Sequence, residues 1–378
     1  MFIFVAKINK KLSVTEKKSF RICIVSEQLA GGGAERCSAI LSQFFVANNC
    51  FVNHIIVINR IGYEYSGELL NLGNLKKENL SILNRFKRLR VLNRFFRENK
   101  FDFIIDTRVL NKQWQEYFIT KFIYNAPLIK MVHSFMTNLY FPKNSFLAKS
   151  IYSKTFKIIT VSDAIKDRIK VNYGYNQVET IYNPIDFNFI NSQLKEDLNL
   201  DFDYVLAVGN MNIDVKQFDH LIECYSNSIL PTLSIKLIII GDGILKSTYE
   251  KMVLSLNLQD KIIFKGSSSN PFPYYKNALF TILTSRNEGF PTVLLESLAC
   301  KTPVVSYNCE SGPSEIIQNN ENGILVENQN KNKMILAMNE MISNKNLYLH
   351  CKNNAKPSVE KFDIQYIGNQ WLQLFNSI

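Results

Sequence analysis

The chain has 378 residues, of which 46% are hydrophobic and 20% charged, a composition that suits two folded domains and excludes a disordered or fibrous protein. Its net charge of +11 comes from the first half, because residues 1–200 hold 29 Lys and Arg against 16 Asp and Glu (+13), which leaves 15 against 17 (−2) for residues 201–378. The seven cysteines are scattered, odd in number and without a C-x-x-C pair, so they favour a reducing compartment and exclude a disulfide framework or a zinc site.

The N-terminus predicts neither a signal peptide nor a membrane-spanning helix. Its apolar run covers only residues 2–6 and is followed by Lys7, Lys10 and Lys11, with no cleavage-site pattern. No later apolar run approaches the ~18 residues that a membrane helix needs. We therefore expect a cytoplasmic protein, with a peripheral position on the inner face of the cytoplasmic membrane left open.

A glycine-rich loop follows the first predicted strand, residues 21–25. Its glycines are Gly31, Gly32 and Gly33, and a helix then runs to about Ala47. Glycines at this place let the backbone approach a ligand closely at a helix N-terminus. The spacing is not G-x-G-x-x-G, so no dinucleotide site is predicted, and a structural tight turn is the alternative.

The densest basic segment of the chain is residues 85–97. It alternates cations with apolar residues at helical spacing, which predicts an amphipathic helix. Such a helix fits an anionic membrane surface, or else a solvated surface helix whose apolar stripe faces the core. No nucleic-acid module accompanies it, so we expect no nucleic-acid partner. The apolar residues of the stripe are Phe86, Leu89, Leu92, Phe95 and Phe96.

Further strands alternate with helical segments, which predicts parallel β/α winding in the first half. His133 ends one of these strands, residues 128–132, at the edge where parallel sheets bind ligands. A lone histidine is usually structural, so the prediction that His133 belongs to a ligand site rests on its position at the end of this strand. Ser162 is expected to cap the following helix. The other expected strands are 54–58, 103–105 and 157–161.

The second half is organised around residues 285–306. An apolar run is broken by the turn Gly289-Phe290-Pro291, and a helix then begins at about Thr292. Glu288 lies in the loop and Glu296 one turn inside the helix, while the helix N-terminus at Thr292 and Val293 offers unpaired N–H groups to a phosphate between the carboxylates. A phosphate with hydroxyl-bearing groups on both sides indicates a sugar nucleotide. A buried helix with two incidental glutamates is the alternative, but it leaves the turn unexplained.

These residues resemble a known family. Glu288 and Glu296, with seven residues between them, precede 312–317 and 321–326 as in the retaining, family 4 type (group 1) glycosyltransferases with the E-x7-E motif. The resemblance covers about residues 20–375.

The resemblance implies an α/β protein of GT-B fold, with two facing Rossmann-like domains and a cleft between them. Residues 1–186 would form the acceptor-binding domain and residues 187–360 the nucleotide-sugar-binding domain. Residues 361–378 would form a C-terminal helix that packs back on the first domain.

It also implies roles for individual residues. Glu288 would hold sugar hydroxyls, Glu296 the ribose hydroxyls, and His133 would contact the transferred sugar. Lys216, in the loop after the strand 204–208, would neutralise the leaving phosphate. The donor-binding candidates are Gly32, Gly33, Asn210, Arg286, Gly289, Phe290, Pro291, Thr292, Val293 and Glu296.

Asn210 departs from the family pattern, which has an arginine six residues before the lysine. One cation fewer should weaken stabilisation of the leaving phosphate unless Arg286, Arg36 or Arg108 substitutes.

The expected reaction is transfer of a sugar from a nucleotide diphosphate sugar, UDP- or GDP-linked, to a hydroxyl of a glycan or lipid-linked acceptor, with retention and without a protein nucleophile or a cofactor. We expect no metal bridge to the diphosphate, because no D-x-D motif is identified anywhere in the sequence. The basic first half favours a lipid-linked acceptor, as in bacterial surface polysaccharide, lipopolysaccharide or protein-glycan assembly. A glycoside hydrolase, an epimerase or phosphorylase, and a non-catalytic sugar-nucleotide-binding protein stay open as alternatives.

Overall fold

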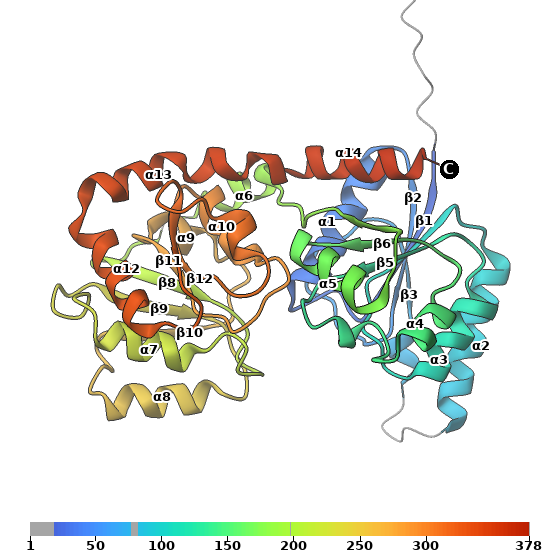
Figure 1. Cartoon of the computed structure of the whole chain (residues 1–378), viewed down its shortest axis with the longest axis horizontal. Coiled ribbons are helices and arrows are strands. Elements are labelled where there is room, and N and C mark those ends of the chain that lie inside the picture. Colours follow the sequence, from blue (N-terminus) through green and yellow to red (C-terminus); the bar gives the residue numbers. More distant parts are fainter. Residues whose placement is uncertain (1–18, 77–81, 197, 378) are drawn as a thin grey trace, which may run out of the picture.

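Two parallel sheets, each flanked by helices, form two domains that lie next to each other (Figure 1). This computed structural model describes residues 19–76, 82–196 and 198–377. The expected basic tail with Lys7, Lys10 and Lys11 lies outside the described residues. The expected class, α/β with two parallel-sheet domains, is confirmed.

The N-terminal sheet has, within the described residues, seven parallel strands in the order β3-β2-β1-β4-β5-β6-β7. Most of these strands are continuous apolar runs, which suits a sheet whose two faces are both covered by helices. The strand order reverses beside β1, and ligands bind outside the carboxyl ends of strands at such a point. The strands are β1 (Arg21–Ser26), β2 (Phe51–Ile56), β3 (Glu68–Asn71), β4 (Phe103–Asp106), β5 (Leu128–Val132), β6 (Thr155–Thr160) and β7 (Val178–Thr180).

The helices of this domain begin and end where local chemistry dictates. The Ser162 hydroxyl accepts a hydrogen bond from Ile165 N and so caps α5, as expected, and Gly174 ends that helix in the left-handed region at φ +64°. The helical segments are α1 (Gly33–Ala47), η1 (Leu72–Leu75), α2 (Ile82–Glu98), α3 (Gln113–Phe118), η2 (Ile119–Ile123), η3 (Thr137–Leu139), α4 (Ser145–Ile151) and α5 (Asp163–Tyr173).

The basic segment 85–97 lies in α2, and its apolar stripe packs mostly inward. Leu89, Leu92 and Phe96 are buried in the core of the domain, whereas Phe86 is exposed. Of the two interpretations of this segment, the structure favours a surface helix whose stripe faces the core.

The C-terminal sheet has six parallel strands among the described residues, in the order β10-β9-β8-β11-β12-β13. Helices cover both of its faces, as Figure 1 shows. The strands are β8 (Tyr204–Val208), β9 (Lys236–Ile240), β10 (Ile262–Gly266), β11 (Thr281–Leu283), β12 (Val304–Tyr307) and β13 (Gly323–Val326). The helices are α6 (Phe187–Gln193), α7 (Phe218–Ser226), α8 (Lys246–Ser255), α9 (Phe272–Asn277), α10 (Thr292–Ala299), α11 (Pro313–Ile316), α12 (Lys331–Ser343), α13 (Lys345–Val359), η4 (Glu360–Phe362) and α14 (Ile364–Phe375).

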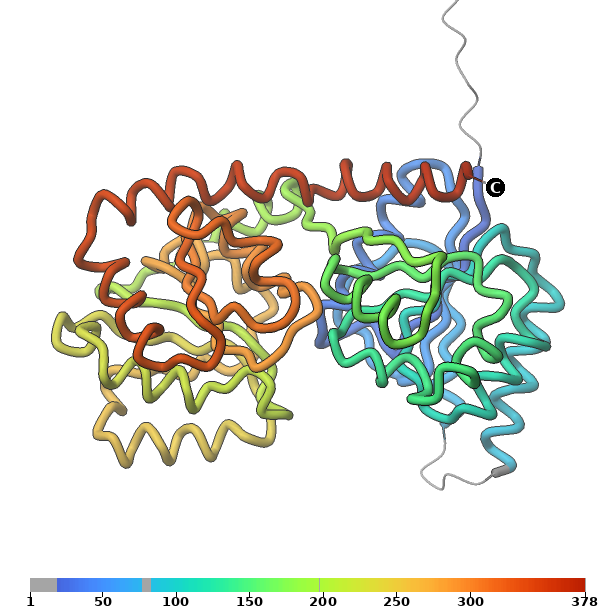
Figure 2. The backbone as a smooth tube through the Cα atoms, viewed as in Figure 1, coloured from blue at the N-terminus to red at the C-terminus, as the bar shows by residue number. Residues whose placement is uncertain are grey.

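The chain crosses between the domains twice, and the two crossings are hydrogen-bonded to each other. Ile185 N donates to Phe362 O at 2.9 Å, and Ile364 N donates to Ile185 O at 2.8 Å. Beyond the second crossing α14 lies along α1, with Trp371 buried against Phe45. Figure 2 shows α13 and α14 as one red path over both domains. This path therefore joins the two domains along one side.

Candidate active site

The two domains touch backbone to backbone at the carboxyl ends of their sheets. His133 directly follows β5, and the Glu288 loop follows β11. Phe135 N donates to Glu288 O at 3.3 Å, and a Cβ added to Gly289 would lie 1.9 Å from His133 O. Only glycine permits this approach, which explains the residue at the start of the Gly-Phe-Pro turn. We call this contact region the seam.

Lys216 and Glu288 meet at the seam although they belong to different loops. Lys216 Nζ lies 2.6 Å from Glu288 Oε1, and both side chains are largely covered. The loop after β8 is fixed to the loop after β11 because Arg286 N donates to Val215 O at 2.8 Å. A cation is thus held beside the carboxylate of a residue whose main-chain carbonyl contacts the other domain.

Glu296 lies in α10 and is paired with a cation from the N-terminal domain. Arg36 Nη1 is 2.9 Å from Glu296 Oε1, and the Tyr275 hydroxyl donates to Glu296 Oε2 at 3.2 Å. The Arg36 guanidinium also lies over the Phe272 ring, 5.2 Å from its centroid. Glu288 and Glu296 therefore contact different partners, as groups at two ends of one ligand would.

The glycine-rich loop lies against the N-terminus of α10. A Cβ on Gly33 would meet Thr292 Oγ1 at 3.5 Å. Gly32 and Pro291 are the N-cap residues of α1 and α10, and within the described residues neither cap supplies a side-chain hydrogen bond. The N-termini of α1 and α10 thus lie close together, and at α10 the N–H groups of Thr292 and Val293 favour an anion, whereas at α1 the Glu35 carboxylate of the first turn lies over Gly32.

His133 is held neutral at physiological pH. Burial, and then the nearby Lys130 ammonium, lower its pKa to about 4. Both ring nitrogens are shielded from solvent and make no hydrogen bond of good geometry within the part of the chain that the structure describes, although the Asn183 side chain lies near enough to oppose the lowering of the pKa. A neutral imidazole with free valences at the seam can both donate and accept a hydrogen bond.

The three arginines that could compensate for Asn210 differ in where they lie. Asn210 itself is exposed, and its Oδ1 accepts from Asn212 N within its own loop at 2.7 Å. Arg286 is exposed and pairs with Asp214 at 3.2 Å, whereas Arg36 lies at the seam.

Arg108 cannot compensate, which corrects that expectation. Its guanidinium is buried and bonded to Asp106 at 2.5 Å and to Glu116 at 3.3 Å. Burial alone would raise the pKa of the Asp106 carboxyl, but Arg108 and Lys130 hold it well below its usual range. This buried group of charges is satisfied internally and has no cation to spare.

Sequence reasoning missed a set of hydrogen bonds that hold the seam together. Ser311 Oγ donates to Gly289 O at 2.7 Å, so the Ser162 hydroxyl supplies the proton of the 2.7 Å contact between Ser162 and Ser311. Glu315 accepts from Asp163 N at 2.8 Å and from Ala164 N at 3.3 Å, and so caps α5 from the opposite domain. The sequence signal was the cap at Ser162. The partners of this helix start could not be seen, because Ser311 follows Ser162 by 149 residues and Glu315 follows Asp163 by 152 residues.

Phe290 completes the contact from the C-terminal domain. Its ring lies 4.9 Å from that of Tyr182 and 5.2 Å from that of Phe362, one on each crossing segment. Asn183 Nδ2 donates to Phe290 O at 3.4 Å. The Gly-Phe-Pro turn is therefore fixed by both crossings.

No cluster of three potential metal ligands occurs among the described residues. The expectation that the sequence holds no D-x-D motif is wrong, because this spacing occurs once, at Asp201-Phe202-Asp203. These residues precede β8 and so lie at its amino end, whereas Lys216 follows its carboxyl end, and both aspartates are exposed. This triplet is thus at the wrong edge of the sheet to serve the seam.

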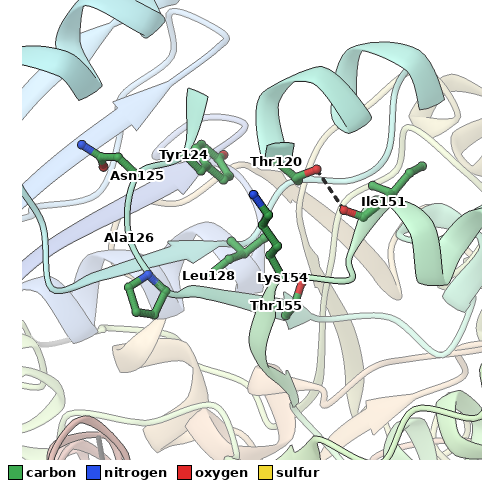
Figure 3. Close-up of a pocket in the computed structure, with 9 residues that line it drawn as sticks. Thr120, Tyr124, Asn125, Ala126, Leu128, Ile151, Lys154 and Thr155 are labelled. Carbon is green, nitrogen blue, oxygen red and sulfur yellow. Dashed lines mark hydrogen bonds between the residues drawn. The ribbon is translucent and has the colours of Figure 1, made fainter. Parts of the chain in front are cut away.

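Two cavities differ in place and size. A cavity of about 10 Å³ lies at the seam between Arg36, Ile40, Thr292 and Glu296, with room for roughly one water molecule. A larger cavity of about 330 Å³ opens at the amino ends of β5 and β6, lined by Thr120, Tyr124, Asn125, Ala126, Pro127, Leu128, Ile151, Lys154 and Thr155 (Figure 3). The larger cavity is at the opposite edge of the sheet from His133, and the seam is closed at its Arg36 end.

Two family models match the chain, one after the other. The model described as Glycosyltransferase Family 4 matches residues 31–189, and the model described as Glycosyl transferases group 1 matches residues 189–357. Together they span most of the chain, and they meet within α6.

Relatives and solved structures give the same picture. The chain is 28% identical over 347 residues to the N-acetylgalactosamine-N,N'-diacetylbacillosaminyl-diphospho-undecaprenol 4-alpha-N-acetylgalactosaminyltransferase of Campylobacter jejuni, covering 89% of this chain and 93% of that protein. It is 26% identical over 376 residues to the GalNAc-alpha-(1->4)-GalNAc-alpha-(1->3)-diNAcBac-PP-undecaprenol alpha-1,4-N-acetyl-D-galactosaminyltransferase of the same organism, covering 95% and 99%. The crystal structure of HepE from Anabaena, in complex with UDP and glucose, is similar in fold, with a TM-score of 0.75, 18% identity and coverage of 95% and 100%.

Proposed function

Because the chain belongs to the group 1 glycosyltransferases of GT-B fold, we propose that it transfers a sugar from a nucleotide diphosphate sugar to a hydroxyl of a lipid-linked glycan, with retention at the anomeric carbon. The pathway class is bacterial glycan or polysaccharide biosynthesis. The donor is UDP- or GDP-linked, and neither a metal nor a cofactor takes part.

One observation carries the proposal. Glu288 and Glu296 lie on either side of the N-terminus of α10, each beside a cation from another segment: Lys216 from the loop after β8 and Arg36 from α1. A diphosphate between the two carboxylates would face helix N–H groups from two domains and two movable cations, with hydroxyl acceptors at both ends. That set of groups matches the sugar, the diphosphate and the ribose of the donor.

The proposed reaction needs no protein nucleophile. The bond between the anomeric carbon and the phosphate oxygen breaks, the bond to the acceptor oxygen forms on the same face, and the acceptor proton passes to the leaving phosphate. Lys216 and the N–H groups of Thr292 and Val293 stabilise the charge that develops on that phosphate. Glu288 and the neutral His133 orient the sugar.

When the donor binds, charged side chains of the site change their partners, and no new charge has to be buried without one. Lys216 leaves Glu288 for the phosphate and frees the carboxylate for sugar hydroxyls. Arg36 stays beside Glu296, which accepts from the ribose, and supplies the positive charge that Asn210 does not. The small cavity at the seam implies that the domains separate to admit the donor and close on it, which excludes water during transfer.

The proposed acceptor is lipid-linked, because both relatives carry a diphospho-undecaprenol or PP-undecaprenol acceptor in their names. The positive charge of residues 1–200 fits an enzyme that works at the anionic inner face of the cytoplasmic membrane. No described helix is both long and apolar enough to cross a membrane.

Thermal unfolding tests the donor site. Purified protein is heated with UDP-, GDP- and ADP-sugars in the presence of EDTA, and Glu296→Ala is measured beside the wild type. A ligand that binds only the folded state raises the free energy of unfolding, by about 2.7 kcal/mol when its concentration is 100 times its Kd, and so raises the midpoint temperature. One base series should stabilise the wild type and not the variant. Equal stabilisation of both proteins would show that the site is elsewhere.

A further inference from the structure

An exposed group of aromatic side chains lies on one side of the N-terminal domain. Trp114, Tyr117, Phe118 and Phe122 occupy α3 and η2, which form one continuous helical segment, and each is between 40% and 66% exposed. Phe118 and Phe122 contact each other, with ring centroids 5.4 Å apart. Phe146 on the neighbouring α4 is 83% exposed. We call these five residues the aromatic face.

The aromatic face lies in a part of the chain with almost no negative charge. Between residues 107 and 162 the only acid is Glu116, which is buried and paired with Arg108. Lys121 approaches the Tyr117 ring at 5.8 Å, and burial together with the nearby Lys154 lowers its pKa, as expected within an unneutralised basic cluster. The lysines of this region that are exposed at least in part are Lys112, Lys121, Lys143, Lys149, Lys154 and Lys157, of which Lys157 is paired with Glu179.

Helix α2 adds further positive charge beside this face. It contacts η2, and α3 in turn contacts α4, so the four segments are neighbours, as Figure 1 shows at the lower right. The described part of α2 leaves Leu83 and Phe86 exposed as well. The exposed apolar surface therefore lies in a basic part of the domain, with Lys121 directly against one of its rings.

The aromatic face is connected to the seam. The loops after β4 and β5 start at the carboxyl edge of the sheet and lead to α3 and α4. They carry Val109, Met136 and Leu139, which are 38% to 41% exposed, and Leu110 N donates to Leu139 O at 2.6 Å to join the two loops. Exposed apolar side chains thus extend from the edge where His133 lies towards the aromatic face.

We propose that the aromatic face inserts between the lipids of an anionic bilayer, with its lysines at the headgroups. Tryptophan, tyrosine and phenylalanine gain by leaving water at the interface, while each lysine near an anionic surface adds about 1 kcal/mol. Contact at this face places the seam near the membrane surface. The inference deepens the proposed function, on which it rests only for the lipid nature of the acceptor.

Charge decides between a bilayer and a second copy of the chain. A symmetric dimer through this face would bring two sets of lysines together, and like charges across an interface oppose association. An anionic lipid surface neutralises the same lysines. The bilayer is therefore the occupant that the structure favours.

The tryptophans make a direct measurement possible. The sequence has two: Trp114 in the aromatic face, and Trp371, which is fully buried beside Phe45 and Phe375. Vesicles of phosphatidylglycerol and phosphatidylcholine should shift the emission of Trp114 to shorter wavelength and leave Trp371 unchanged. Trp114→Phe should lose the shift yet still sediment with the vesicles.

A double variant measures how much the face contributes. Phe118→Ser with Phe122→Ser should weaken sedimentation with anionic vesicles at least roughly tenfold, because two aromatic rings lose their burial. The matched control is Leu254→Ser with Leu336→Ser, which removes two side chains of similar exposure from α8 and α12 and should bind as wild type does.

Three results would overturn the inference: wild-type affinity of the Phe118 and Phe122 variant, equal binding to pure phosphatidylcholine vesicles, or a dimer in light scattering that this variant converts to monomers. Stabilisation by the donor is measured on the same samples without vesicles. A variant that keeps donor binding and loses vesicle binding supports the inference. If the wild type binds the donor but no vesicles, only the membrane inference is refuted. If the wild type does not bind the donor, the proposed function is refuted.

Discussion

Arg36 determines the electrostatics at the Glu296 end of the proposed donor site. It is the only one of the three candidate arginines that reaches the seam in the described residues, and it neutralises a carboxylate that is 5% exposed. Removing it leaves that carboxylate buried without a cation, which is costly.

Arg36→Ala should therefore raise the donor KM by roughly tenfold to a hundredfold. Arg286→Ala is the matched control, because its pair with Asp214 is solvent-exposed and such pairs contribute about 0–1 kcal/mol. Steady-state kinetics with varied donor concentration provide the measurement. A larger effect of Arg286→Ala than of Arg36→Ala would transfer the compensating role to Arg286.

His54 should make the protein less stable in mild acid. Burial in β2 lowers its pKa from 6.5 to about 4, so the unfolded chain binds a proton that the folded chain refuses between these values. Stability therefore falls as pH drops from 6.5 towards 4, by about 2 kcal/mol at pH 5 from this residue. Urea unfolding at pH 7 and pH 5 should show a smaller loss for His54→Leu than for wild type. Buried Glu27 and Glu35, whose pKa values are raised, act in the opposite direction in both proteins and cancel in the comparison. Equal losses would refute the assignment.

Single residues could be placed from the sequence where the fold fixes them. His133 lies at the end of β5 and Thr292 begins α10, as the pattern predicted. The partners of Glu296 could not be found, because Arg36 approaches it only once the two domains have packed, and Tyr275 only once α9 has packed against α10. Arg108 misled for a different reason, since the acids that neutralise it, Asp106 and Glu116, lie within its own domain and close to it in the sequence.

Among the elements, the turn between β11 and α10 limits how closely the domains approach. A methyl group on Gly289 has no room beside His133 O unless the domains separate. Gly289→Ala should therefore hold the seam open, lowering kcat at least roughly tenfold, since small misplacements in a closed site cost as much or more. A larger radius of gyration with bound donor, measured by small-angle scattering, is the second expected result.

Gly174→Ala is the control for this variant. It forces a side chain into the left-handed backbone at the end of α5, at a cost of about 1 kcal/mol, but contacts no residue of the other domain. It should lower stability and leave kcat unchanged. Equal kcat values for Gly289→Ala and wild type would contradict the role of the turn.

Buried elements with continuous apolar patterns were predictable, and short or partly exposed ones were not. β5 has the expected bounds, because a run of buried apolar residues admits one assignment, and α14 lies within the expected C-terminal helix 361–378. β3 and β7 were missed, since they are short outer strands and few of their side chains are buried. β2 begins at Phe51 rather than at His54, where the apolar run seemed to start.

At the scale of the whole molecule, two kinds of contact control the domains. The crossings at Ile185 and Phe362, together with α13 and α14, form a hydrogen-bonded connection that packs into the cores of both domains. The seam consists instead of a few hydrogen bonds, the ion pair of Arg36 with Glu296, the ring contacts of Phe290 and one glycine approach. Because the connection is well packed and the seam is weak, the connection can act as a hinge on one side while the seam opens on the other. The sequence predicted two domains, but their mutual contacts depend on pairs such as Asp163 and Glu315 that have no local pattern.

The most direct test of the central claim is the configuration of the product. The protein is incubated, in EDTA, with the α-linked UDP- or GDP-sugar that stabilises it and with a polyprenyl-diphosphate-linked glycan, and the new linkage is assigned by NMR. The account predicts an α-linked product and a rate at least roughly a hundredfold lower for Glu288→Gln, about 3 kcal/mol of transition-state stabilisation. A β-linked product, or release of free sugar at a rate that ignores the acceptor, would contradict it.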